Sequence, residues 1–407
     1  MEKACGLDVH KDSVFACILD EQGKKNFEKR YGTLTPDLDA LRDTLVEHGC
    51  GRVAMESTSI YWMPIWRILS SDFSLKLANP YFIKQLPGRK SDMKDAAWIA
   101  ECLQKDLIKD SFVADEVLQQ MRQYTRQHRR LTKSRVRLEQ QLDNQLQRCN
   151  TCASQSASIR ISNYVSNQGR NKSIRKVINK MISGERNSEN LCGLVHGRTK
   201  NKYGKQVIAD SLNGFIGKAD VEMLKQCMDQ IELIEKQQAT CLTLLEELAN
   251  THFAKEITLL CTIPGIQKFS AMCIIAEIGT DMSVFAKAVD LVGWIGFKPR
   301  NDETSEKIKC RRIVYGNKYV RQILVEISWS AARSGKSFLG RKFKALSGRM
   351  KSQKALIAIT RKIVVIIYNV IKTKQPFDPK KNTSCFVHVC CTQSKQSTSI
   401  QADKACF

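Results

Sequence analysis

The chain has 407 residues, 43% of them hydrophobic, and its 65 Lys and Arg against 41 Asp and Glu give a formal net charge of +24. This length exceeds one ordinary hydrophobic core, so we expect two or three domains. No apolar run approaches the roughly 20 residues of a membrane-spanning helix, so we expect no membrane partner, and the excess of positive charge favours a polyanion such as nucleic acid.

The first hundred residues alternate between strand and helix patterns. The predicted order is strands at 3–10, 13–20 and 26–33, a helix at 35–49 with Thr35 as its N-cap, a strand at 51–57, a helix at 61–71, a strand at 74–80 and a helix at 92–106. This order is that of the ribonuclease H-like fold, which we expect for a domain at residues 1–112. In that fold a first-strand Asp and a fourth-strand Glu lie side by side.

Four acidic residues occupy the corresponding places. Asp8 and Glu56 end apolar strand patterns, and Asp92 and Asp95 lie three residues apart on one face of the predicted helix. Each acid alone is ordinary, because an Asp at a strand end is usually a cap or turn residue. Together the four can hold divalent cations, and Mg²⁺ suits ligation by carboxylates alone.

Residues 113–254 are predicted to form long helices around a basic insert. The helix at 116–148 carries many Lys and Arg, and the helix at 219–249 has a heptad seam that includes the polar Gln238. Such a seam predicts a coiled coil, either within the chain or between subunits. Exposed cations of the first helix would lie against nucleic acid. These are Arg122, Arg126, Arg129, Arg130 and Lys133.

Residues 255–376 are predicted to form a mainly helical domain, interrupted by a basic loop at 297–317. The tail at 377–407 is polar, and we expect it to be disordered. The 16 cysteines have irregular spacing, which favours reduced core residues over disulfides. The sequence near Met1 lacks the apolar region of a signal peptide, so we expect a cytoplasmic protein that associates with the nucleoid.

Several of these segments carry a resemblance to a known family. GLDVHKD, AMESTSIYW and KSDMKDAAWIAE resemble the DEDD-type insertion-sequence transposases, relatives of the Piv-like DNA invertases whose N-terminal domain is similar to the junction resolvase RuvC. LLCTIPGIQKFSAMCIIAEIG, VFAKAVDLVGWIGFKPRNDETSEK and YGNKYVRQILVEISWSAAR resemble the C-terminal transposase domain of that family. The resemblance covers about residues 4–375 and implies an α/β domain followed by helical ones.

The resemblance also implies a reaction. Family members cut and rejoin DNA with a serine nucleophile beside the Mg²⁺-dependent acids, which would be Asp8, Glu56, Asp92 and Asp95 here. It further implies a structured non-coding guide RNA and a homo-oligomer, a dimer or a tetramer. The basic helix and insert are the candidate RNA-contacting surfaces, although the sequence contains no RNA-recognition motif.

The serine segment departs from the family pattern. Aligning GFKPRNDETSEK places Thr304 at the serine position, with Ser305 next to it and Glu306 where glycine is usual. Either hydroxyl is a candidate nucleophile, and a polar loop that contacts phosphate is an equal alternative. Nearby cations would stabilise the developing negative charge or bind the DNA backbone. These are Lys307, Lys309, Arg311 and Arg312, with Arg321 on the following helix.

The sequence therefore predicts a DNA transposase or site-specific recombinase. Two alternatives stay open at this stage. One is a metal-dependent nuclease of the Holliday-junction type that uses water and forms no covalent intermediate. The other is an inactive nucleic-acid-binding remnant of a mobile element.

Overall fold

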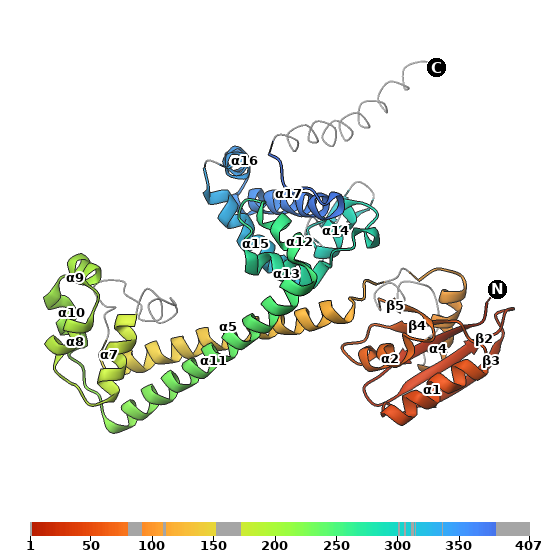
Figure 1. The fold of residues 1–407 in the computed structure, drawn as a ribbon, viewed down its shortest axis with the longest axis horizontal. Helices are drawn as coiled ribbons and strands as arrows, with labels where there is room; N and C mark the ends of the chain where they lie inside the picture. Colours follow the sequence, from red (N-terminus) through yellow and green to blue (C-terminus); the bar gives the residue numbers. More distant parts are fainter. Residues whose placement is uncertain are drawn as a thin grey trace, which may run out of the picture. The chain divides into compact units, whose positions relative to one another are not determined.

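A computed structural model of the chain describes residues 2–79, 92–108, 111–151, 172–299, 302–304, 307–310, 313, 315–335 and 337–379 (Figure 1). The chain divides into two compact units, Met1–Val113 and Ala114–Phe407. Residues 152–171 of the predicted insert and residues 380–407 of the predicted tail lie outside the described residues. Within the described part of the chain, no helix is long and apolar enough to cross a membrane.

The first unit contains a five-stranded mixed sheet. Its strands are β1 (Ala4–Val9), β2 (Val14–Leu19), β3 (Lys25–Tyr31), β4 (Arg52–Glu56) and β5 (Ser74–Ala78). The order across the sheet is β3-β2-β1-β4-β5, with β1–β2 and β2–β3 antiparallel and β1–β4 and β4–β5 parallel. This is the ribonuclease H-like arrangement that the sequence predicted.

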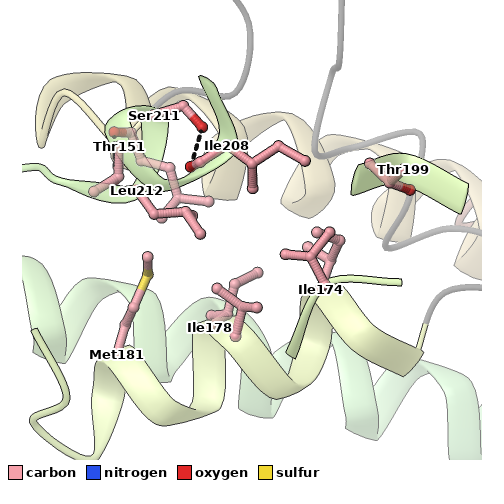
Figure 2. Close-up of a pocket in the computed structure, with 11 residues that line it drawn as sticks. Thr151, Ile174, Ile178, Met181, Thr199, Ile208, Ser211 and Leu212 are labelled. Atoms are coloured by element: carbon pink, nitrogen blue, oxygen red, sulfur yellow. Dashed lines mark hydrogen bonds between the residues drawn. The ribbon is translucent and has the colours of Figure 1, made fainter. Parts of the chain in front are cut away.

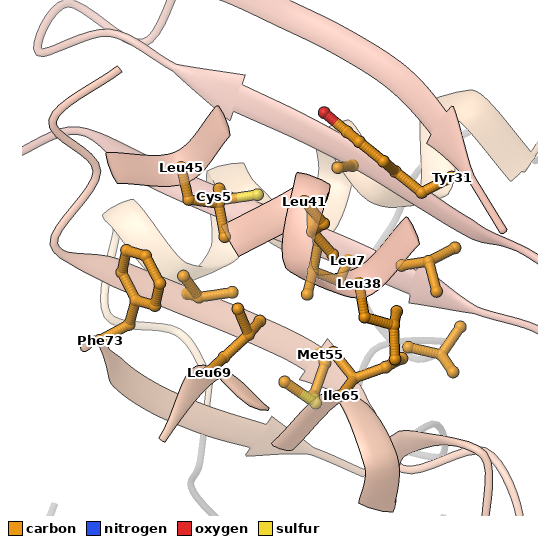
Figure 3. Packing of buried hydrophobic residues seen from close by; sticks show 14 of the residues in the cluster. Cys5, Leu7, Tyr31, Leu38, Leu41, Leu45, Met55, Ile65, Leu69 and Phe73 are labelled. Carbon is orange, nitrogen blue, oxygen red and sulfur yellow. The ribbon is translucent and has the colours of Figure 1, made fainter. Parts of the chain in front are cut away.

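Alternate residues of each strand face different helices. Odd-numbered residues of β1, such as Cys5 and Leu7, pack with α1 (Thr35–Glu47) and α2 (Trp62–Leu69) in the core shown in Figure 3. The even-numbered Ala4 packs instead with α4 (Asp92–Gln104) on the other face. Because strand side chains alternate with period two, Asp8 belongs to the α4 face.

One local prediction in this unit is wrong. Thr35 is the first residue of α1 and Leu34 is its N-cap, and no side chain accepts a hydrogen bond there. Pro36 lies in the first turn, where the missing N–H group costs no helical hydrogen bond. The proline, rather than a hydroxyl cap, therefore marks the start of this helix.

The second unit contains a helical hairpin of α5 (Glu116–Arg148) and α11 (Lys218–His252) (Figure 1). Gln145 near the end of α5 donates to Asp220 near the start of α11 at 2.7 Å, so the two helices run antiparallel. Gln238 is 5% exposed, donates to Thr132 Oγ1 at 2.7 Å and accepts from Arg135 at 3.3 Å. The polar seam residue thus fixes the register of a pairing within the chain.

In the described residues 172–212, four short helices lie between the two arms of this hairpin. They are α7 (Lys172–Ile182), α8 (Ser188–Leu194), α9 (Gly197–Tyr203) and α10 (Lys205–Leu212). Their apolar side chains pack with the end of α5 and the start of α11. Ile178, Met181 and Leu212 line a small apolar cavity of about 20 Å³ (Figure 2). This volume holds about one water, so it is a packing void rather than a ligand site.

The rest of the second unit is a helical module. Its elements are α12 (Ala254–Cys261), α13 (Lys268–Ile278), η1 (Met282–Val284), α14 (Ala288–Ile295), β6 (Asp302–Thr304), β7 (Lys307–Cys310), α15 (Lys318–Arg333), α16 (Phe338–Ser347) and α17 (Ser352–Thr373). Residues 271–278 of α13 are all buried, because α5, α12 and α15 pack around this helix.

The described cysteines fit the prediction of reduced core residues. Seven of the ten are buried, and none of the ten forms a disulfide. Burial raises the pKa of Cys17 to about 11 and that of Cys273 to about 12. Such thiols stay protonated near neutral pH and are poor nucleophiles or metal ligands.

Candidate active site

Strand register brings Asp8 and Glu56 together. Leu7 of β1 pairs with Met55 of β4 in a parallel ladder, and the next position on each strand is Asp8 and Glu56. Residues in register on neighbouring strands project from the same face, about 5 Å apart. Asp8 is only 5% exposed, and Glu56 is half-buried. Two carboxylates therefore lie at the carboxyl ends of adjacent strands.

Gly6 lets α4 approach the same face closely. A Cβ atom at Gly6 would lie 2.1 Å from the carbonyl oxygen of Ala96 and 2.4 Å from the amide nitrogen of Ala100. Both are backbone atoms of α4, so neither can move without the helix. The contact requires glycine at this position, and it fixes α4 over β1.

The direction of α4 then places its first turn beside Asp8. Gln104 at the end of α4 donates to the carbonyl of Glu2, just before β1, at 3.2 Å. The helix therefore runs antiparallel to β1, and its start lies near the end of the strand. That start carries Asp92 and Asp95, of which Asp95 is half-buried and the side chain of Asp92 lies outside the described residues.

We expect Gly6→Ala to destabilise the first unit by about 1–3 kcal/mol, because the new methyl group overlaps backbone atoms of α4. The helix would move away with Asp92 and Asp95, so strand cutting should fall as well. Chemical unfolding measures the first effect. Gly51→Ala is the matched control, since a Cβ there meets nothing within 4 Å. Equal stability of the two variants would contradict the close contact.

His10 is a site residue that sequence reasoning set aside. Its Nε2 lies 3.1 Å from Oδ2 of Asp8, and its ring meets Phe15 edge-on. The side chain of His10 is 43% exposed, whereas that of Asp8 is 8% exposed. His10 thus contacts the candidate ligand from the solvent side. The signal was its position two residues beyond Asp8, on the same face of the chain.

The donor set suits a hard divalent cation. Asp8, Glu56 and Asp95 would supply carboxylate oxygens, which are the ligands that Mg²⁺ and similar ions prefer. Among the described side chains, a set that omits Asp92, no three acidic, His or Cys groups are close enough to form a ready-made metal site. The strand register and the direction of α4 are therefore the observations that bring the predicted ligands to one end of the sheet.

The predicted nucleophile segment forms a small hairpin in the second unit. β6 pairs antiparallel with β7, Thr304 opposes Lys307, and a bridge joins Pro299 to Ile313. Lys309 also lies in β7. The side chains of both strands lie outside the described residues, as do Ser305, Arg311 and Arg312 entirely.

Both ends of this hairpin are fixed to α14. A Cβ at Gly316 would lie 2.3 Å from the backbone carbon of Ile295, so only glycine permits this approach. The amide of Asn317 donates to the carbonyl of Trp294 at 3.3 Å. At the other end, Phe297 is completely buried. The chain thus leaves and re-enters the helical module at one place.

A buried carboxylate links this place to α5. Glu277, near the end of α13, is 1% exposed and accepts two hydrogen bonds of 2.9 Å from Arg126. Asn317 Nδ2 donates to the same carboxylate at 2.7 Å, while its Oδ1 accepts from Tyr319 N and caps α15. Arg122 donates to the carbonyl of Glu277 at 2.7 Å. The sequence signal for these buried contacts was the single Glu within the apolar helix segment IIAEIG.

These contacts of Glu277 contradict part of the predicted nucleic-acid surface. Arg122 and Arg126 were expected to be exposed, but their side chains are 16% and 34% exposed and bond to α13. Arg129 is half-buried, and its guanidinium lies 5.5 Å from the ring centre of Tyr319. α5 has a second partner besides α11, and that partner buries the arginines. Of the five cations predicted to be exposed, only Arg130 and Lys133 are exposed.

Arg321 is also less available than predicted. It is half-buried, and its guanidinium lies 5.5 Å from the ring centre of Phe297. This cation–π contact joins α15 to the residue that begins the hairpin segment. Arg321 therefore contributes to packing at the base of the hairpin.

Two segments of the chain match models of one transposase family. Residues 5–151 match a model described as a DEDD transposase, and residues 257–342 match one described as "Transposase IS116/IS110/IS902 family". Together the matches cover more than half of the chain. The chain belongs to the IS116/IS110/IS902 transposase family.

The first match extends beyond the first compact unit, because it includes α5, which belongs to the second unit. The first contains the sheet, all four acids and α5, and the second runs from α12 into α16 and contains the hairpin. The bundle of α7–α10 lies between them. Each model thus covers one of the two places where sequence reasoning predicted catalytic groups.

Individual relatives are more distant. The chain is 33% identical over 129 residues to the pilin gene-inverting proteins of Moraxella bovis and Moraxella lacunata. The alignment covers 30% of this chain and 39% of each relative, so the chain spans about two fifths of their length. T. thermophilus RuvC in complex with a Holliday junction substrate aligns with 27% of this chain and 99% of that one, at 10% identity and a TM-score of 0.22.

Proposed function

We propose that this protein is a DNA transposase or site-specific recombinase that cuts and rejoins DNA at the ends of a mobile element and at its target. The observation that supports the proposal is the placement of the elements that carry the acids. Asp8 and Glu56 are register neighbours, and the first turn of α4 lies over the same end of the sheet. The family membership supplies the reaction class.

The proposed first half of the site is a metal centre. Asp8, Glu56, Asp92 and Asp95 would hold divalent ions, for which we propose Mg²⁺. A bound ion of this kind stabilises charge on the attacking and leaving oxygens at phosphorus. The protein's part is to keep four carboxylates in one place despite their repulsion. The buried position of Asp8 and the glycine contact under α4 serve that purpose.

The proposed second half is the hydroxyl of Ser305 or Thr304. Attack on phosphorus would form a new P–O bond to the side chain and break one P–O bond of the DNA, and the released DNA hydroxyl would take up a proton. A free hydroxyl is a weak nucleophile and needs activation by a base, an ion or cations. Lys307 and Lys309 of β7 are the nearest cations along the hairpin.

Two partners complete the proposal. A structured non-coding RNA would guide target choice, and a homo-oligomer would bring the hydroxyl of one subunit to the acids of another. Arg130 and Lys133 on α5 are exposed and suited to phosphate contacts. Both the RNA and the oligomer are carried over from the family resemblance.

Trapping tests the proposed covalent step. Protein, Mg²⁺, element-end DNA and RNA from the flanking non-coding region are incubated, and a protein–DNA adduct is sought after denaturation. We expect an adduct with the unmodified chain, and we expect Ser305→Ala or Thr304→Ala to abolish it. The variant that loses the adduct identifies the nucleophile.

The other outcomes decide between the alternatives. DNA cleavage without an adduct, unaffected by either substitution, would instead indicate a nuclease that uses water. Binding without cleavage, with or without RNA, would indicate an inactive remnant. Omitting the RNA in a parallel reaction tests whether a guide is required.

A further inference from the structure

The C-terminal part of the chain contains a long segment without any acidic residue. Between Glu326 and Asp378 the sequence has twelve Lys and Arg and no Asp or Glu. This segment forms the end of α15, all of α16 and all of α17. Most solvated helix faces mix both signs of charge. A segment this long with a single sign therefore has another explanation.

The cations of α17 form one stripe. Lys354, Arg361 and Lys372 are exposed, while Ala355, Ile359 and most other residues of α17 are buried. The three cations are separated by seven and eleven residues, which places them within about 20° of one another around the helix axis. Along the axis they span about 27 Å, which is roughly eight base pairs of a duplex.

The stripe continues into the preceding turn. Arg349 and Lys351 are exposed between α16 and α17. Burial and, to a smaller extent, the neighbouring Lys342 of α16 together lower the pKa of Lys362 to about 7, as expected where cations crowd together. Within the described part of the chain, none of Lys354, Arg361 and Lys372 forms an ion pair, although Lys372 donates a hydrogen bond to Tyr368 Oη at 3.2 Å. The charge of the stripe is therefore available to a polyanion.

α11 of the same unit provides an internal comparison. Its exposed Lys218, Lys225 and Lys236 have the same seven- and eleven-residue spacing as the cations of α17. Acidic residues such as Glu222 and Glu232 lie between them on α11. The two helices thus present the same geometry of cations, and only α17 presents it without acids.

We infer that the exposed stripe of α17, with the turn before it, binds the phosphate backbone of duplex DNA beside the reacting site. DNA is favoured because α17 packs against α14 and α15, the two helices that fix the ends of the hairpin. The stripe therefore belongs to the module that would present the hydroxyl. This inference rests on the proposed function for the choice of DNA, and it adds a binding surface that the four acids and the hairpin do not supply.

The test compares two triple variants in binding to a 30-base-pair DNA duplex. Fluorescence anisotropy is measured between 0.05 and 0.2 M NaCl. EDTA is present throughout and prevents metal-dependent cutting. Each phosphate contact contributes about 0.9 to the log–log salt slope. We expect Lys354→Gln, Arg361→Gln and Lys372→Gln together to make the slope shallower by about 2.7 and to weaken binding.

Lys218→Gln, Lys225→Gln and Lys236→Gln together are the matched control, with the same change in charge and the same spacing on α11. An equal loss in this control would overturn the inference, because net charge alone would then explain it. An unchanged slope in the α17 variant would overturn it as well. Thermal unfolding of both variants verifies that the comparison is made between folded proteins.

Binding of the same variants to an RNA duplex of the same sequence tests whether the stripe binds DNA or RNA. Loss of RNA binding alone would overturn the assignment to DNA. Failure of the proposed function would give a different result: the unmodified chain would neither cut DNA nor form an adduct. That result would leave the salt-dependent binding curves in EDTA unaffected.

Discussion

Asp8→Asn is expected to reduce strand cutting by about a thousandfold or more, since each factor of ten corresponds to about 1.4 kcal/mol of transition-state stabilisation and a metal centre supplies several. The substitution keeps the shape of the side chain and removes its charge. Single-turnover cleavage of element-end DNA with Mg²⁺ measures the effect. Stability should stay equal or rise, because a buried carboxylate no longer repels Glu56.

A matched control uses the other end of α4. Glu101→Gln removes a charge from a residue whose side chain is 42% exposed and pairs with Lys105, and it should leave cutting unchanged. Mg²⁺ should raise the melting temperature of the unmodified chain and of the control, but not that of Asp8→Asn. Full cutting by Asp8→Asn would eliminate the proposed metal centre.

Glu277→Ala should destabilise the second unit by about 3–5 kcal/mol, since breaking a buried ion pair leaves its partner charge uncompensated. The variant deprives Arg126 of two acceptors and Asn317 of one. It also weakens the N-terminal cap of α15, which follows the hairpin of β6 and β7. Denaturant unfolding measures the stability, and hydrogen exchange at residues 302–317 should increase more than exchange at α17.

The control for this effect is an exposed ion pair in the same unit. Glu246 lies 3.8 Å from Lys268, and both side chains are about half exposed, at 41% and 50%. Glu246→Ala should cost at most about 1 kcal/mol. A similar cost for Glu277→Ala would show that the buried contacts of Glu277 are not a principal support of this unit.

The sequence predicted the sheet because local signals and global topology agree there. The alternating pattern of β1, the strand–helix order and the positions of Asp8 and Glu56 all point to the ribonuclease H-like arrangement. Gly6 was not singled out, because the need for glycine depends on how closely α4 approaches, and that distance is a tertiary property.

The arginines of α5 could not be placed from the sequence for a related reason. A helix pattern reveals which face is apolar, and it does not reveal whether a polar face is covered by another element. Arg126 looks like a solvated cation until Glu277 is found 151 positions further along the chain. Similarly, the seam of α11 could not distinguish a partner in the same chain from one in another subunit.

The antiparallel pairing of α5 and α11 makes the chain between them separable. One arm leaves the helical module and the other returns to it, and Gln238 sets their register without help from α7–α10. Because α7–α10 cover apolar side chains at the end of α5 and the start of α11, they should be replaceable by a short turn or a foreign domain when both arms are shortened past those side chains. A shortened hairpin of α5 and α11 would keep its register only if equal lengths were removed from both arms. A foreign domain could therefore be inserted at the tip of this hairpin, with both arms shortened by whole heptads.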